Sequence, residues 1–149
     1  MFREPGPDQP RQNRALLVVA AVLLCLIAVA AALYLLSLYP GDLGVAVVRI
    51  EGVIVTGDSY GNGYTGSEYA GRQIRDAADD PLVHAIVLRI DSPGGTPAAA
   101  QEIVADVKYA REKKPVVVSM GEMATSSAYY ISAYADRIYA DPDTITGGI

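Results

Sequence analysis

The strongest constraint on the fold is one uninterrupted apolar segment near the start of the chain. Residues 15–38, ALLVVAAVLLCLIAVAAALYLLSL, contain no charged side chain. A helix rises about 1.5 Å per residue, so this segment exceeds the roughly 20 residues that cross a lipid bilayer. It is also longer than the apolar core of a cleaved signal peptide, which has about 7–15 residues. The sequence therefore predicts a transmembrane signal anchor over residues 15–38, with a cleaved signal peptide as the alternative.

Charges on either side of this segment predict its orientation. Arg11 and Arg14 precede it, whereas Asp42 follows it and the next basic residue is Arg49. Positively charged flanks tend to stay in the cytoplasm. We therefore expect residues 1–14 to form a cytoplasmic tail and the rest of the chain to lie outside the cytoplasm. The tail is rich in Pro, Gln and charge, which is typical of a disordered segment.

The composition argues against several arrangements. Cys25 is the only cysteine, so no disulfide within the chain is possible. The net charge is −5, and no stripe of Lys and Arg follows the apolar segment, which argues against binding to nucleic acid. No group of His, Cys, Asp and Glu has the spacing of a metal site. We expect neither a metal nor another cofactor.

Strand and helix patterns alternate along residues 44–149. Short runs of Val and Ile predict buried strands, and apolar residues repeated every three to four positions predict helices. The expected strands are 44–55, 83–90, one that starts at Pro115 and breaks at Gly121, and 137–140; the expected helices are 67–78, 97–113 and a short one through Tyr130 and Tyr134. Residues 56–66, dense in Gly, are expected to form a loop. This alternation predicts an α/β fold with a largely parallel sheet.

Two of the expected helices begin with capping signals. Thr65 stands three residues before Glu68, which is the spacing of a capping box. Thr96 is followed by Pro97, and this pairs an N-cap residue with a first-turn proline. Both signals support the predicted helix starts.

Two short motifs follow the C-terminal ends of predicted strands, where sites form in open parallel sheets. The first is Asp91-Ser92-Pro93-Gly94-Gly95, whose glycines can expose bare N–H groups toward an anion. The second is Thr125-Ser126-Ser127, where a serine at a helix start has its hydroxyl near free amides. Each has a plain alternative when taken alone, namely a tight turn for the first and a helix cap for the second.

In this order, the two motifs resemble those of the signal peptide peptidase A (SppA) family of membrane-anchored serine proteases. The similarity runs from about Val45 to the end of the chain, through VLRIDSPGGTPAAAQEI and KPVVVSMGEMATSSAYYISAYADRIYADPDTITGGI. It implies a fold of the Clp-protease/crotonase superfamily, with repeated β-β-α and β-α-β units. Residues 44–149 would be the N-terminal part of that peptidase domain. Family members pair a serine nucleophile with a lysine general base.

Matched residue by residue, the resemblance places the nucleophile at Ser126. It implies that Gly94, Gly95 and the amide of Ser127 form the oxyanion hole, which binds the negatively charged oxygen of the transition state. The family usually has Gly-Gly where this chain has Ser127-Ala128, and TGSIG where it has TGGI. We expect a side chain at position 95 to lower activity more than folding.

The family's base lysine lies past the end of this chain, and no residue present is expected to replace it. Lys108, Lys113 and Lys114 look solvated beside other charges, whereas a base lysine needs a lowered pKa. His84, the single histidine, opens a strand at the end opposite the serine turn, and Asp91 is expected to cap a turn. This chain alone is therefore expected to be inactive.

The resemblance implies a membrane-anchored Ser/Lys endopeptidase that degrades remnant signal peptides or similar apolar peptides. Its implied partners are the peptide substrate, membrane lipid and further copies of itself, because the family assembles into rings. Two alternatives stay open. One is a stomatin-operon-type membrane protease, against which the pair Tyr129-Tyr130 argues mildly. The other is a non-catalytic membrane scaffold of the same fold, which Ser127-Ala128 favours. A crotonase-type acyl-CoA enzyme fits an exported domain less well.

Overall fold

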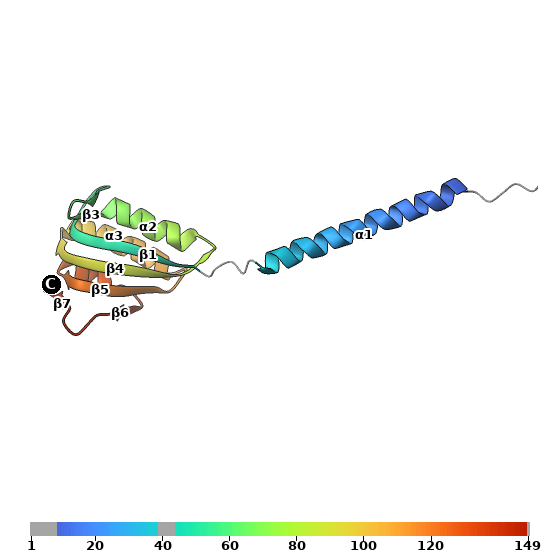
Figure 1. Ribbon diagram of the computed structural model, residues 1–149. Helices are drawn as coiled ribbons and strands as arrows, with labels where there is room; N and C mark the ends of the chain where they lie inside the picture. The colour runs from blue at the N-terminus through green and yellow to red at the C-terminus, as the bar shows by residue number, and fades with distance from the viewer. Residues whose placement is uncertain (1–8, 39–43, 149) are drawn as a thin grey trace, which may run out of the picture. The chain divides into compact units, whose positions relative to one another are not determined.

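The computed structural model describes residues 9–38 and 44–148, and the chain divides into two compact units. The first unit contains one helix, α1 (Gln9–Leu38) (Figure 1). Its segment Leu16–Leu35 is long and apolar enough to cross a membrane. The predicted apolar helix is therefore present, and it begins at Gln9 rather than at Ala15. Residues 1–8 of the expected tail lie outside the described residues.

The second unit is an α/β domain with a mostly parallel sheet, as predicted. Its elements are β1 (Gly44–Val55), β2 (Tyr60–Gly61), β3 (Tyr64–Gly66), α2 (Ser67–Asp79), β4 (Val83–Gly95), α3 (Pro97–Arg111), β5 (Val116–Thr125), α4 (Ser127–Ser132), β6 (Arg137–Tyr139) and β7 (Ile145–Gly147). The strand order is β2-β3-β1-β4-β5-β6, and β7 pairs with β5. Among the described strands, only β2 and β3 pair antiparallel.

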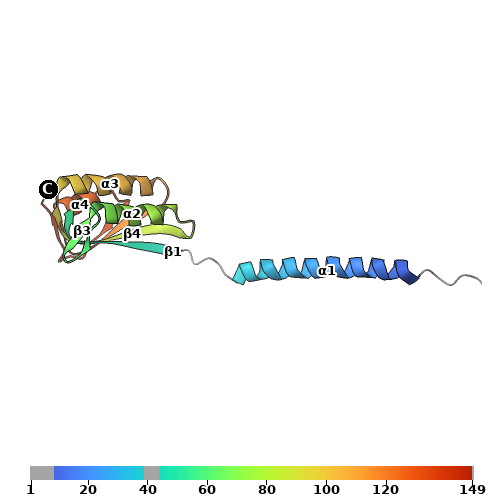
Figure 2. The same cartoon turned by 90° about the horizontal axis from the view of Figure 1, so that it is seen from above.

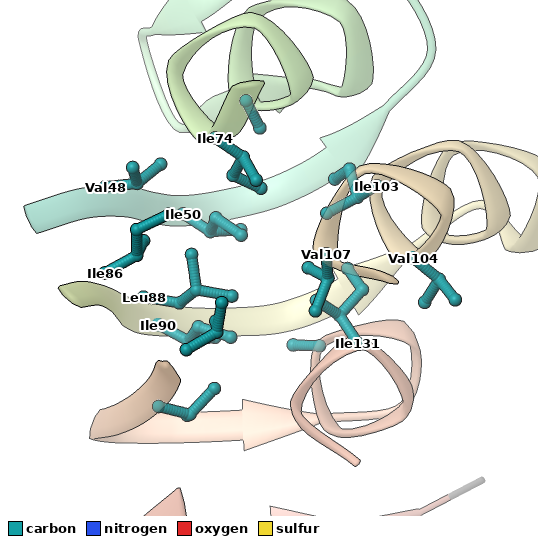
Figure 3. Packing of buried hydrophobic residues seen from close by; sticks show 14 of the residues in the cluster. Val48, Ile50, Ile74, Ile86, Leu88, Ile90, Ile103, Val104, Val107 and Ile131 are labelled. Atoms are coloured by element: carbon teal, nitrogen blue, oxygen red, sulfur yellow. The ribbon is translucent and has the colours of Figure 1, made fainter. Parts of the chain in front are cut away.

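Helices α2, α3 and α4 lie on one face of the sheet (Figure 2). Strand residues alternate between the two faces, so Val48 and Ile50 are buried while Val45 and Val47 are each 57% exposed. Figure 3 shows the buried aliphatic side chains of β1 and β4 facing those of the helices, among them Ile74, Ile103, Val107 and Ile131. This one-sided core holds the C-terminal ends of β1, β4 and β5 together.

The two central strands extend further than predicted, because each keeps pairing past the expected break. β4 continues through Gly95, since Val53 pairs with Gly94 and Ile54 pairs with Gly95. The expected sharp turn at residues 91–95 is therefore wrong. Register shifts after Glu51 and after Ile90 mark bulges that bend β1 and β4 at this point.

The expected break at Gly121 is also wrong, because β5 runs through it to Thr125. Gly121 serves a packing role. A Cβ atom there would come within 2.7 Å of the Asp91 carboxyl carbon on β4. A glycine in a strand often marks such a close approach.

Residues 56–66, expected to be a loop, contain a β-hairpin. Asn62 and Gly63 form the two-residue connection between β2 and β3, with φ values of 51° and 82°. Both values lie in the left-handed region that a type I′ turn requires, and Asn-Gly is the dipeptide typical of that turn. The hairpin could therefore have been predicted from this dipeptide.

One of the two predicted caps is correct. Thr96 is the N-cap of α3, and its hydroxyl accepts a 3.4 Å bond from the Ala99 N–H. The capping box at Thr65 is wrong, because Gly66 is the N-cap of α2 and makes no side-chain cap. The Thr65 hydroxyl instead exchanges bonds of 2.7 and 3.0 Å with the backbone of Glu51 on β1. The short helix α4 ends at Ser132, before Tyr134.

Candidate active site

Ser126 lies at a sharp turn between β5 and α4. Its backbone has φ 53° and ψ −124°, a conformation that residues with a side chain rarely adopt. Two backbone bonds hold the turn: the Ser126 N–H donates to the Gly147 carbonyl at 2.8 Å, and the Ser126 carbonyl accepts from the Tyr130 N–H at 2.9 Å. A strained strand-to-helix turn of this kind exposes the side chain of the nucleophilic serine in α/β-hydrolases. The Ser126 side chain is half-buried.

The two motifs meet at Gly94 and Ser126. A Cβ atom on Gly94 would lie 2.8 Å from the Ser126 Cβ and 3.0 Å from the Ser127 nitrogen, so only glycine fits between them. Gly94 has φ 100°, which also favours glycine. However, the Gly94 N–H already donates to the buried hydroxyl of Ser92 at 3.0 Å. Gly94 therefore supplies space beside Ser126, while its own amide is engaged.

The Gly95 amide has a different orientation. Ile54 pairs with Gly95, and the Ile54 carbonyl accepts from the Thr96 N–H at 2.9 Å. In an extended strand, the N–H and C=O of one residue point to the same edge. The Gly95 carbonyl accepts from the Ser127 hydroxyl at 2.8 Å, so the Gly95 N–H also points toward the serine turn and away from β1.

The backbone of β1 lies close behind Gly95. A Cβ atom on Gly95 would overlap the Ile54 carbonyl oxygen. We therefore revise the expectation for position 95 and predict a loss of folding, because the space that a side chain would occupy is filled by a neighbouring strand.

The side chain of Ser127 is buried beneath the turn and is only 7% exposed. Its hydroxyl is bonded to Gly95, and Ala128 behind it is fully buried. The Ser127 N–H belongs to the first turn of α4, where amides have no partner within the helix. The substitution of Ser127-Ala128 for Gly-Gly therefore leaves the amide available and directs the added side chains away from solvent.

A pocket of about 340 Å³ opens beside Ser126. It is lined by Pro97, Ala100, Gln101, Ser126, Ser127 and Tyr130. Its polar end is formed by Gln101, whose amide donates to the Tyr130 hydroxyl at 2.8 Å. A larger pocket of about 550 Å³ between α2 and α3 contains no residue of the two motifs, and its Arg75 and Asp106 are paired at 2.5 Å.

No hydrogen bond joins the Ser126 hydroxyl to a basic group within residues 9–38 and 44–148. Lys113 contacts the Asp79 carboxylate and the Tyr109 hydroxyl, and these bonds raise the pKa of Lys113, whereas a general base needs a lowered one. The Lys114 ammonium donates to backbone carbonyls at the end of α2, and Lys108 lies 4.6 Å from the centre of the Tyr134 ring.

His84 and Asp91 do not serve Ser126 as a base either, because His84 lies far from it and the Asp91 carboxylate is bonded elsewhere. His84 is exposed near the start of β4, at the end of the sheet opposite the serine turn. Asp91 does not cap a turn of its own, because its carboxylate accepts from the Met123 N–H on β5 at 3.1 Å. Across the described parts of the chain, no three His, Cys, Asp or Glu side chains converge as metal ligands would.

This fold is the ClpP/crotonase-like α/β fold of serine peptidases. A solved serine-to-alanine mutant of the 1510-N membrane-bound stomatin-specific protease aligns with a TM-score of 0.51 and 25% identity. The alignment covers 68% of this chain and 44% of that one.

The sequence comparisons identify the family. The profile of peptidase family S49 matches residues 108–149. Protease 4 of Salmonella typhi is 48% identical over 113 residues, which are 74% of this chain and 18% of that protein. The chloroplastic serine protease SPPA of Arabidopsis thaliana is 38% identical over 77 residues, 52% of this chain and 11% of that protein. The chain belongs to peptidase family S49, and it spans less than a fifth of the length of these relatives.

Proposed function

We propose that this chain carries the anchor, the nucleophile and the oxyanion hole of a membrane-bound Ser/Lys endopeptidase. The observation that supports this most directly is the contact between the two motifs. The strained turn at Ser126 lies against Gly94, and the Gly95 N–H faces the same turn. The pairing of β4 with β5 brings the two motifs side by side, and Gly94 leaves room there for the Ser126 turn that a side chain would fill.

In the proposed reaction, the Ser126 hydroxyl attacks the carbonyl carbon of the scissile peptide bond. A new C–O bond forms, and the hydroxyl proton passes to a neutral lysine. The carbonyl oxygen gains the negative charge and accepts hydrogen bonds from the N–H groups of Gly95 and Ser127. The intermediate then expels the amine, which takes the proton from the lysine, and water releases the acyl group from Ser126.

This assignment refines the role of Gly94. The sequence placed it in the oxyanion hole, and its N–H donates to Ser92 instead of facing the turn. We propose that Gly94 contributes the space beside Ser126 and that Gly95 and Ser127 supply the two donors.

We propose that the general base is a lysine outside this chain, either further along the whole protein or from a neighbouring copy in a ring. Lys108, Lys113 and Lys114 all make other contacts. This chain in detergent is expected to leave an apolar fluorogenic peptide uncleaved, whereas a longer protein that includes the rest of the domain should cleave it. A serine hydroxyl without a base is a weak nucleophile at neutral pH.

The control for this comparison is Ser126→Ala in both proteins. Cleavage by the short chain that disappears in Ser126→Ala, and also in one of the three single lysine-to-alanine variants, would show that the base is already present. That result would contradict the proposed Ser/Lys pair.

The proposed substrates are extended apolar peptides such as remnant signal peptides. The pocket beside Ser126 is lined largely by small or apolar groups, and helix α1 is long and apolar enough to hold such an enzyme at a membrane. A stomatin-type substrate is the second candidate, because a solved relative of similar fold is described as stomatin-specific. Comparing the cleavage of signal peptides with that of stomatin-derived peptides by the same preparation distinguishes the two. The scaffold alternative is weaker, since Ser127 and Ala128 leave the turn unobstructed.

We propose that α1 anchors the protein with residues 44–149 outside the cytoplasm, because Arg11 and Arg14 precede the apolar run. Protease added to intact cells is expected to digest the domain and leave a membrane-embedded fragment that contains α1. Protection of the domain in intact cells, with digestion only after lysis, would reverse the orientation.

A further inference from the structure

Backbone pairing between β4 and β5 ends where the site begins. Ser92 and Ala124 are the last paired residues of the two strands. Beyond them, two side-chain hydroxyls bridge the strands: Thr125 donates to the Pro93 carbonyl at 2.9 Å, and Ser127 donates to the Gly95 carbonyl at 2.8 Å. Side-chain bonds therefore replace the strand ladder at this point.

These two bonds are arranged symmetrically about the site. Their donors are the immediate neighbours of Ser126, and their acceptors are the immediate neighbours of Gly94. Gly94 lies so close to Ser126 that a Cβ added to Gly94 would come within 2.8 Å of the Ser126 Cβ. Two attachment points, one on each side of a contact, prevent the turn from pivoting about it.

Burial at Ser127 and strain at Ser126 favour a role in positioning, although the Thr125 bond is exposed. The Ser127 side chain is 7% exposed, so water cannot readily replace its bond to Gly95. Ser126 has a backbone conformation that persists only when surrounding contacts enforce it. The Gly95 carbonyl shares its strand edge with the Gly95 N–H, so fixing that carbonyl also fixes the direction of the amide.

We propose that the hydroxyls of Thr125 and Ser127 form a two-point latch that positions the Ser126 nucleophile against the Gly95 amide. The latch rests on the proposed function, and its two side-chain hydroxyls act by positioning the backbone, whereas the oxyanion is bound by the separate backbone N–H of Ser127.

The test measures kcat and KM for the whole protein in detergent, on an apolar fluorogenic peptide. Thr125→Val and Ser127→Ala are each expected to lower kcat about 10-fold and leave KM within about twofold, because oxyanion contacts form only in the transition state. The double variant should fall well short of the 100-fold product, since either loss alone lets the turn pivot. Thr125→Ser, which keeps the hydroxyl, should restore parent turnover.

Ser132→Ala is the matched control. Its buried hydroxyl donates to the Ala128 carbonyl at 2.7 Å, which is the same kind of bond on the same helix but away from Ser126. A kcat loss in Ser132→Ala equal to that in Ser127→Ala would overturn the latch in favour of general loosening of α4. Parent kcat in both latch variants would overturn it directly.

A second measurement separates failure of the latch from failure of the proposed function. Amide hydrogen exchange at Gly95 should accelerate in Ser127→Ala and stay at the parent rate in Ser132→Ala, whether or not the protein hydrolyses peptides. Persistent hydrolysis in Ser126→Ala would refute the proposed function alone. Unchanged exchange at Gly95 would refute the latch alone.

Discussion

Replacement of Ser126 by alanine is expected to lower peptide hydrolysis by the whole protein by about four orders of magnitude or more. Loss of an activated nucleophile costs up to about 10⁶-fold in kcat in serine peptidases, although the oxyanion donors and substrate binding sustain a residual rate about 10³–10⁴-fold above that in water. The loss should appear in kcat, with KM close to that of the parent, because the pocket beside the turn is retained. Steady-state kinetics on a fluorogenic apolar peptide provide the measurement.

Two further variants serve as controls for Ser126→Ala. Ser132→Ala should retain parent activity and show that removal of a buried serine hydroxyl from α4 is tolerated. Ser127→Ala keeps its backbone N–H and should lose only the modest factor expected for the latch. Loss of all activity in Ser127→Ala, together with hydrolysis by Ser126→Ala, would place the nucleophile one residue later.

Replacement of Gly95 by alanine is expected to prevent folding of the α/β domain. The added Cβ would overlap the Ile54 carbonyl oxygen, and the backbones of the two central strands β4 and β1 fix the positions of both atoms. No side-chain rotation can relieve that overlap, so the strands must separate. A loss of several kcal/mol is comparable with the whole stability of a small domain, about 5–15 kcal/mol. Far-UV circular dichroism and resistance to limited proteolysis in detergent measure the effect.

Gly61→Ala is the control for this variant, because it introduces backbone strain without an atomic overlap. Gly61 has φ 98° and no atom near the position of a Cβ, so alanine there meets backbone strain but no overlap. That strain costs about 1–3 kcal/mol, and the domain is expected to stay folded. A folded but slow Gly95→Ala variant would instead restore the original expectation that position 95 affects activity before folding.

The sequence alone was sufficient for features that depend on local pattern. The run from Ala15 to Leu38 predicted a helix, and α1 contains a segment that is long and apolar enough to cross a membrane. Alternation of β-branched runs with helical periodicity was sufficient for the parallel α/β domain, and Thr96 with Pro97 located the start of α3. The Asn62-Gly63 dipeptide is an equally clear local signal for a hairpin, although residues 56–66 were expected to form a loop.

Tertiary structure decided which groups of the two motifs can act. The sequence could not show that the Gly94 N–H donates its hydrogen bond to the Ser92 hydroxyl. The orientation of that hydroxyl depends on its own bond to the Gly52 carbonyl of β1, 40 residues away. Nor could the sequence show that Ser127 turns inward to Gly95 across 32 residues. Residue spacing predicts where a chain turns, because local sterics determine backbone dihedrals. The partner of a buried amide or hydroxyl depends on which distant strand lies beside it, and only the packed sheet brings β1, β4 and β5 close enough to make that choice.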